Sequence, residues 1–211
     1  MKHVLNNFNF IQNKINGISK TVKLIAVTKN KSFDYIQPLL QINHFDYGEN
    51  IIQEANNKWH SLLLSNKQIR LHLVGRIQSN KAKQAFNLFE YIHSLDSEKL
   101  AKIFSNLEKE HAIKKKYFIQ VNIGSEEQKA GISLDKLSDF SNLCKNQLNL
   151  NILGFMCIPP INEDPKKYFT KLFELNGHYK YKELSMGMSS DYEEAIRCGS
   201  TYVRIGSAIF N

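Results

Sequence analysis

Small residues follow two apolar runs near the end of the chain, and their types and spacing suit the binding of a phosphate group. Ser189 comes shortly after the run Glu183–Met186, while Gly206 and Ser207 come directly after the run Tyr202–Ile205. At a turn that follows a strand, the backbone N–H groups of such residues can face an anion, and a serine hydroxyl adds a donor. The two segments together therefore predict a phosphate site.

Lys29 adds an amine to this chemistry. It follows the short apolar run Leu24–Thr28, so we expect it at the end of another strand. A lysine opposite a phosphate site is the arrangement that holds a phosphorylated aldehyde cofactor as a Schiff base. Glycine–serine turns and lysines after strands are each common without any such role, so the prediction depends on the two features occurring together.

Eight strand-like runs alternate with helical stretches along the chain and must position these residues. The runs predicted as strands are Lys23–Thr28, Phe45–Tyr47, Arg70–Val74, Tyr91–Leu95, Tyr117–Ile123, Ile152–Met156, Glu183–Met186 and Tyr202–Ile205. Their spacing of about 25 residues fits repeating βα units and a parallel sheet. Eight such units predict a closed (β/α)8 TIM barrel. An open doubly wound sheet is the main alternative, although no GxGxxG or GxxxxGK[ST] motif follows the first strand.

Helical periodicity fills the segments between these strands. An amphipathic opening helix is predicted at about residues 3–20, and later helices are predicted over Ile51–Leu64, Ser97–His111, Leu134–Gln147 and Pro165–Tyr179. Pro38 falls inside the helix expected after the first strand, where it should kink that helix or delay its start.

Length and composition favour one cytoplasmic domain over residues 1–211. With 211 residues, 42% of them hydrophobic, the chain is long enough to bury a full core. Cys144, Cys157 and Cys198 are scattered and form no CxxC pair, which argues against a disulfide framework and for a reducing compartment. No continuous apolar segment predicts a signal peptide or a membrane span, and no histidine or cysteine cluster has the spacing of a metal site.

The net charge of +8 makes nucleic acid a candidate partner that has to be weighed. The excess is almost entirely lysine, and arginine occurs only at Arg70, Arg76, Arg197 and Arg204. Proteins that read base sequence depend on arginine for bidentate contacts, and these four are not clustered. The densest run, Lys114–Lys116, is expected between a helix and a strand, where it can complement the helix C-terminus or face water. We therefore expect no nucleic-acid partner.

In a (β/α)8 barrel, chemistry collects at the carboxyl ends of the strands, and the unusual residues of this chain fall there. The candidate site residues are Lys29, Asn50, His72, Met156, Ser189, Arg204, Gly206 and Ser207. Three of them have structural alternatives. Asn50 is equally well explained as the N-cap of a helix, His72 as a satisfied core histidine, and Met156 as filling of the barrel.

Arg204 is the most informative of these candidates. It lies among apolar strand residues, where a charged side chain needs a partner. That partner is either a bound cofactor or a carboxylate, and Glu49 and Asp191 are the candidate carboxylates for a buried ion pair.

Eight ordered motifs of the chain resemble those of a known family. They are Ala26–Lys29, Tyr47–Glu54, His72–Gly75, Gln78–Lys81, Lys129–Gly131, Gly154–Pro159, Ser185–Asp191 and Val203–Phe210. In type and order they are similar to the motifs of the pyridoxal phosphate homeostasis proteins, the YggS or PROSC family, which are relatives of the alanine racemase barrel domain. The resemblance extends from about Lys23 to Phe210 and implies a single barrel of the alanine racemase N-terminal type.

The resemblance implies that pyridoxal 5′-phosphate (PLP) is bound as a Schiff base on Lys29. It implies that Ser189, Gly206 and Ser207 bind the phosphate, that Arg204 faces the pyridine nitrogen and that Asn50 contacts the ring. His72 and Met156 are further candidate cofactor contacts because of their place in the barrel strands. Two features depart from the family pattern. Ser32 stands where the family usually has a proline, and the sequence ends at Asn211 without the usual short glycine-arginine-tyrosine-like tail, which puts contacts of that tail in doubt.

An arginine at the ring nitrogen would discourage protonation of that nitrogen and weaken the cofactor as an electron sink. Racemisation also needs two proton-transfer groups on opposite faces of the substrate, and the barrel leaves no room for the second domain that supplies one in the racemases. We therefore expect a non-catalytic, monomeric, cytoplasmic protein that takes up PLP and supplies it to apo PLP-dependent enzymes. The alternative is a slow PLP-dependent amino-acid racemase or lyase.

Overall fold

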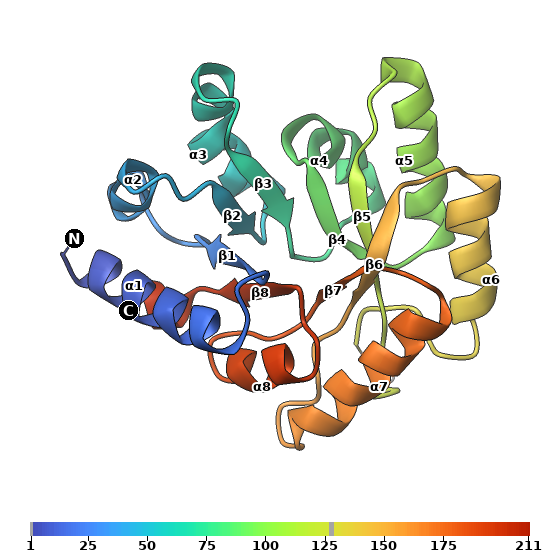
Figure 1. Ribbon diagram of the computed structural model, residues 1–211. Coiled ribbons are helices and arrows are strands. Elements are labelled where there is room, and N and C mark those ends of the chain that lie inside the picture. Colours follow the sequence, from blue (N-terminus) through green and yellow to red (C-terminus); the bar gives the residue numbers. More distant parts are fainter. Residues whose placement is uncertain (1, 127–128) are drawn as a thin grey trace.

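A computed structural model describes residues 2–126 and 129–211, so residues 1, 127 and 128 of the predicted domain lie outside the described part. Eight parallel strands close into a barrel in chain order, with the last strand paired to the first (Figure 1). The strands are β1 (Lys23–Val27), β2 (Asp46–Glu49), β3 (Arg70–Leu73), β4 (Tyr91–Leu95), β5 (Lys116–Gln120), β6 (Ile152–Met156), β7 (Glu183–Ser185) and β8 (Tyr202–Ile205). This closure confirms the predicted (β/α)8 barrel and rules out the open sheet.

Helices surround the barrel, as Figure 1 shows. They are α1 (Lys2–Ile18), α2 (Phe33–Gln41), α3 (Ile52–Ser65), α4 (Ala82–Leu88), α5 (Glu98–His111), α6 (Leu137–Asn142), α7 (Pro165–His178), α8 (Tyr192–Arg197) and α9 (Ser207–Phe210). A 3₁₀ turn, η1 (Ser79–Lys81), precedes α4, and a π-helical turn, η2 (Leu143–Gln147), continues α6. The amphipathic helix α1 lies against α9 and α8, so the two ends of the chain meet. None of the described helices has the length and apolar character needed to cross a membrane.

Many element boundaries differ from the sequence prediction by one or two residues, and three differences bear on the site or are larger. The second strand occupies Asp46–Glu49 instead of Phe45–Tyr47. The fifth ends at Gln120 instead of Ile123, because the chain turns there and the Asn122 amide donates to the carbonyl of Ile132 over 2.9 Å. The predicted helix over Leu134–Gln147 begins only at Leu137.

Pro38 does not delay the helix that contains it. Helix α2 begins at Phe33, and Pro38 lies buried inside it. The hydrogen bond that proline cannot make would have reached the carbonyl of Asp34, which is in the exposed first turn, where water can satisfy it. The predicted late start was therefore wrong.

The interior of the barrel contains a small apolar cluster and a set of buried polar groups. The apolar cluster consists of Ile25, Val27, Tyr91, Phe118, Met156 and Tyr202, and it is separate from the larger core between strands and helices. The buried polar side chains of the interior include Asp46, His72, His93, Ser185 and Arg204. Because buried polar groups need hydrogen-bond partners, their arrangement is constrained as strongly as the apolar packing.

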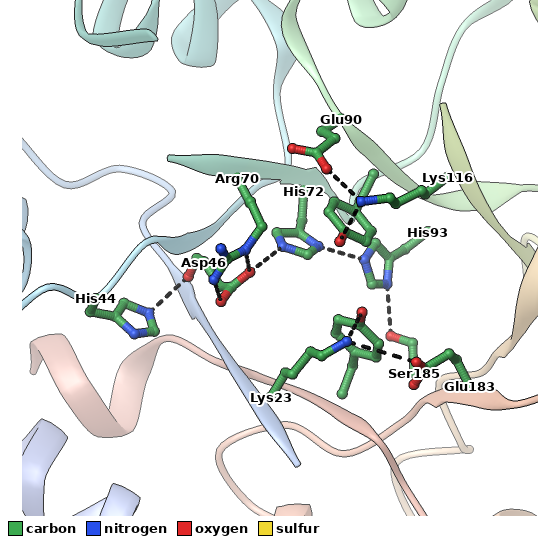
Figure 2. Close-up of polar contacts among 12 residues, drawn as sticks. Lys23, His44, Asp46, Arg70, His72, Glu90, His93, Lys116, Glu183 and Ser185 are labelled. Atoms are coloured by element: carbon green, nitrogen blue, oxygen red, sulfur yellow. Dashed lines mark hydrogen bonds and ion pairs between the residues drawn. The ribbon is translucent and has the colours of Figure 1, made fainter. Parts of the chain in front are cut away.

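Tyrosine hydroxyls and lysines close the amino-terminal end of the barrel. Lys116 Nζ lies 2.6 Å from Glu90 Oε1 and 3.0 Å from the hydroxyl of Tyr91. On the other side, Lys23 Nζ donates to the hydroxyl of Tyr202 over 2.7 Å. Figure 2 shows both lysines around the buried histidines. The opposite end of the barrel, where the strands terminate, is the end that carries a cavity.

Candidate functional site

A cavity of about 350 Å³ opens at the carboxyl ends of β1 and β8. Six of the eight candidate residues line it, namely Lys29, Asn50, Ser189, Arg204, Gly206 and Ser207. Val27, Val74, Ile158, Met188 and Ser190 complete its described lining. Residues up to 178 positions apart in the sequence (29 to 207) therefore meet in one place, as the barrel prediction required.

The other two candidates, His72 and Met156, do not line this cavity. His72 is fully buried within the barrel and contacts Asp46 and His93. Met156 is also fully buried and belongs to the apolar interior cluster. Their surroundings correspond to the alternatives given above, a satisfied core histidine and barrel filling.

Two turns in the cavity wall present free backbone donors. In the described part of the chain, the N–H groups of Ser189, Ser190, Gly206 and Ser207 donate to no protein acceptor. The Oγ of Ser189 accepts a hydrogen bond from the amide of Ala208 over 3.3 Å, which ties the two turns together. Unpaired N–H donors on adjoining turns in a cavity wall are the kind of groups that can bind an anion such as phosphate.

Glycine is required in the first of these turns, and the second has little room for a side chain. Gly187 has a φ of 95°, and a Cβ there would lie 2.6 Å from the Cβ of Ala195. A Cβ on Gly206 would lie 3.1 Å from the carbonyl oxygen of Val27, so the end of β8 passes close to the end of β1. These close approaches bring the serine turns against the segment that carries Lys29.

Helix α3 holds the backbone on both sides of Lys29. Lys58 Nζ donates to the carbonyl oxygen of Thr28 over 2.6 Å, and Glu54 Oε1 accepts from the amide of Asn30 over 2.6 Å. Lys58 and Glu54 also pair with each other over 2.9 Å, at i and i+4 on the helix. Asn30 adopts a left-handed conformation with a φ of 57°, which turns the chain immediately after Lys29. The lysine is therefore exposed on a backbone that is fixed from behind.

A buried carboxylate anchors this arrangement. Glu49 is fully buried, and its Oε1 accepts hydrogen bonds from Thr28 Oγ1 at 2.6 Å, Lys58 Nζ at 2.8 Å and Trp59 Nε1 at 2.8 Å. Sequence reasoning did not find this network. Its signal was present, because Glu54 and Lys58 have the helical i, i+4 spacing of an ion pair.

Asn50 lines the cavity and does not cap helix α3. The N-cap position is Ile51, and within the described residues the Asn50 side chain makes no hydrogen bond. The N-cap alternative is therefore wrong. The Asn50 backbone is held by the end of β3, where a Cβ on Gly75 would lie 2.1 Å from the Asn50 carbonyl oxygen. Only glycine permits this approach.

Arg204 is a buried cation without an ion pair among the described residues. It is 5% exposed, its Nη1 donates to Ser185 Oγ over 2.7 Å, and its Nη2 donates to the carbonyl oxygen of Cys157 over 3.0 Å. The ion pair considered with Glu49 or Asp191 does not form, because Glu49 contacts Lys58 and the carboxylate of Asp191 accepts from the amide of Met188. Burial lowers the pKa of Arg204 from its ordinary value, but a guanidinium remains protonated. A buried, unpaired cation at a cavity calls for an acceptor on a ligand.

Comparison with known proteins agrees with this geometry. The whole chain, residues 1–211, matches the family described as alanine racemase, N-terminal domain. The "Pyridoxal phosphate homeostasis protein" of Haemophilus influenzae is 32% identical over 99% of this chain and 95% of its own length. The protein of the same name from Vibrio cholerae is 34% identical over 100% of this chain and 93% of its own length. The chain belongs to the pyridoxal phosphate homeostasis protein family.

Solved structures of other proteins have the same fold as this chain. PipY of Synechococcus elongatus, in a structure with PLP bound, is 29% identical with a TM-score of 0.85, covering 95% of this chain and 100% of that chain. Alanine racemase from Corynebacterium glutamicum is 13% identical with a TM-score of 0.72, covering 99% of this chain and 60% of that chain. At that identity the racemase shares the fold alone. The alanine racemase type of barrel is thereby confirmed.

Proposed function

We propose that this protein binds PLP in the cavity at the ends of β1 and β8 and acts in the homeostasis and supply of that cofactor. One observation carries the proposal: an exposed lysine, four free backbone donors and an unpaired buried arginine line one cavity of about 350 Å³. These are the groups that an aldehyde, a phosphate and a pyridine nitrogen require. The PLP-bound structure of PipY and the printed name of the relatives support the same ligand.

Each group has a defined part in the proposed complex. The amides of the Ser189 and Gly206 turns bind the phosphate, Arg204 donates to the pyridine nitrogen, and Asn50 lies beside the ring. Lys29 would hold the aldehyde of the cofactor covalently through its amine, with one water molecule released on attachment and taken up again on release. When bound, the cofactor supplies an aldehyde. Because the lysine attachment is reversed by water, the cofactor can be held and released again.

The cavity supports a carrier more than an enzyme. Among the described lining residues, Lys29 and Arg204 are the titratable ones, and a guanidinium does not act as a base near neutral pH. Racemisation requires a second acid–base group on the opposite face of the substrate. We therefore propose a non-catalytic role, in which apo PLP-dependent enzymes receive the cofactor from a monomeric, cytoplasmic protein. The three free cysteines suit that compartment.

The visible spectrum of the purified protein, before and after reduction with borohydride, tests the binding site. The protein should be yellow, and reduction should fix the cofactor to Lys29 in a peptide map. Lys29→Ala should abolish the visible band and keep the fold, because an exposed residue after a strand is not part of the core. Lys31→Ala is the matched control and should keep the band. A label on Lys31 instead of Lys29 would refute the assignment.

A second experiment separates the carrier from the slow racemase or lyase. Deuterium incorporation from heavy water into L- and D-alanine and serine is followed by NMR, while recovery of an apo PLP-dependent enzyme mixed with the loaded protein is followed in parallel. The carrier predicts negligible exchange together with reactivation of the apo-enzyme. Rapid, stereoselective exchange that disappears in Lys29→Ala would establish the enzyme.

A further inference from the structure

A continuous line of hydrogen bonds crosses the barrel interior and ends at Arg204. Asp46 Oδ1 lies 3.1 Å from His72 Nε2, and His72 Nδ1 lies 3.0 Å from His93 Nε2. His93 Nδ1 then lies 2.8 Å from Ser185 Oγ, which accepts from Arg204 Nη1 over 2.7 Å. Figure 2 shows the line from Asp46 through the two histidines to Ser185. It begins at the first residue of β2, at the amino-terminal end of the barrel, and finishes at the cavity.

Donor and acceptor rules give every bond in this line one direction. An ionised carboxylate can only accept, so His72 Nε2 carries a proton and donates to Asp46. A neutral His72 then accepts at Nδ1, so His93 Nε2 is the donor. His93 in turn accepts at Nδ1, and the hydroxyl proton of Ser185 must point toward it. The lone pairs of Ser185 Oγ are thereby left for Arg204, which can only donate.

The surroundings hold this protonation pattern in place. Burial alone would raise the pKa of Asp46, but hydrogen bonds from Arg70 and His72 outweigh it and keep that carboxyl ionised. Arg70 binds both oxygens of Asp46, at 2.7 and 2.6 Å. Burial lowers the pKa of His72 and of His93, so both rings stay neutral.

Aromatic stacking fixes the two rings. His72 stacks on Tyr91 at 4.3 Å between ring centroids, and His93 stacks on Phe118 at 4.5 Å. Both histidines and Ser185 are at most 1% exposed, so water cannot replace any of their partners. The line is therefore a rigid connection between two charged groups at opposite ends of the barrel.

We propose that Asp46, His72, His93 and Ser185 form a polarised relay that positions Arg204 for the ring nitrogen of the bound cofactor. The relay gives the buried guanidinium a fixed neutral acceptor, the hydroxyl of Ser185, and no carboxylate is hydrogen-bonded to Arg204 among the described residues. Arg204 consequently keeps N–H groups that have no acceptor among the described residues, at the edge of the cavity that it lines. A direct ion pair would have used those groups. These four are positioning residues, and their role rests on the proposed function.

The direction of the relay can be tested without any ligand. Long-range ¹H–¹⁵N NMR of the ligand-free protein at pH 7.5 should show His72 and His93 as neutral rings protonated at Nε2. Ser185→Ala removes one hydroxyl from the interior and should shift the His93 Nδ1 resonance, because that nitrogen loses its donor. A wild-type His93 protonated at Nδ1, or charged, would overturn the proposal.

The positioning role is tested by titrating pyridoxal 5′-phosphate and following the visible absorbance of the bound form. Ser185→Ala and Asp46→Asn should each raise the dissociation constant about tenfold, as expected for a lost hydrogen bond involving charge, and should shift the absorbance maximum. Asp46 does not line the cavity, so a merely structural role would change stability and leave the spectrum unchanged. Tyr91→Phe is the matched control, because it removes a hydroxyl at the barrel base outside the relay.

Dissociation constants and absorbance maxima equal to wild type in both relay variants would overturn the positioning role. A wild-type protein that binds no cofactor would instead refute the proposed function, and the direction of the relay would then be judged by the histidine tautomers alone. The two failures are thus distinguishable.

Discussion

Replacing Lys58 by methionine should destabilise the protein strongly, although Lys58 lies outside the cavity wall. The ammonium group is the only cation within 4.0 Å of the fully buried Glu49 carboxylate in the described structure, and its side chain is itself 9% exposed. It also donates to the carbonyl of Thr28, next to Lys29. Methionine has a similar length and keeps the apolar contacts, so the change isolates the charge.

The magnitude follows from the burial of Glu49. Removing one partner of a buried ion pair leaves an uncompensated charge and costs about 3–5 kcal/mol. The second oxygen of Glu49 already lacks a hydrogen-bond partner in the described structure, so only the neutral donors of Thr28 and Trp59 on the first oxygen would remain to stabilise the charge. An exposed pair gives the contrast. Lys14 and Glu193 are 43% and 34% exposed, so Lys14→Met should lower the free energy of unfolding far less than Lys58→Met.

Urea unfolding, followed by circular dichroism, measures both variants. If the loss in Lys58→Met arises from the orphaned carboxylate, Glu49→Gln in the same chain should restore at least about 2 kcal/mol, which a double-mutant cycle quantifies. The proposed Schiff base on Lys29 should form more slowly in Lys58→Met, because the carbonyl of Thr28, next to Lys29, loses its donor. A loss in Lys58→Met no larger than the loss in Lys14→Met would refute the reasoning.

Two further predictions concern the cavity and the pH dependence of stability. Ser189→Ala and Gly206→Val should weaken PLP binding by about one to two decades while the fold is kept. Pyridoxal without phosphate should bind the wild type and both variants equally poorly. Good binding of pyridoxal to the wild type would show that the phosphate site is misassigned. Burial lowers the pKa of His44 to about 4. A histidine in the unfolded chain titrates near pH 6.5. The contribution of neutral His44 to the free energy of unfolding is therefore complete above pH 6.5 and is lost as pH falls toward 4, and the loss is about 2 kcal/mol at pH 5. Between pH 7.5 and pH 5, the free energy of unfolding in urea should fall correspondingly less in His44→Phe than in the wild type. An equal fall in both proteins would contradict the assignment to His44.

The sequence was sufficient for the barrel and for most of the cavity because both depend on regular features. Strands buried on both faces read as apolar runs, and their spacing determines the number of βα units. Once the units are counted, the residues after each run are placed at one end of the barrel. Lys29, Ser189 and Gly206 follow directly from that rule, and the cavity contains all three.

The partners of Arg204 could not be predicted by the same reasoning. Charge alone suggested Glu49 or Asp191, whereas the contact is with Ser185 on the neighbouring strand. That choice depends on the register of β7 and β8, where Ser185 pairs with Tyr202. A shift of one residue would turn the serine to the other face of the sheet, and periodicity does not determine boundaries to one residue.

The relay could not be predicted from the sequence for a related reason. His72 was recognised as a histidine inside a strand, but its partner Asp46 was placed near the middle of a strand predicted one residue too early. Only closure of the barrel brings His93 from β4 to Ser185 on β7. Contacts across the interior of a closed barrel join strands that are distant in sequence, so local pattern carries no information about them.

The hydrogen bonds that hold Arg204 connect the fold to the proposed role. A guanidinium held by a serine hydroxyl and a carbonyl can donate to the ring nitrogen but cannot give up its proton, so in the proposed complex that nitrogen stays unprotonated. An unprotonated ring withdraws electrons weakly, which slows every reaction that needs a carbanion on the bound amino acid. Reversible exchange of the aldehyde between water and lysine needs no such carbanion. In the proposed role, the interior of the barrel would therefore let a cofactor be held and released while disfavouring reactions that pass through a carbanion.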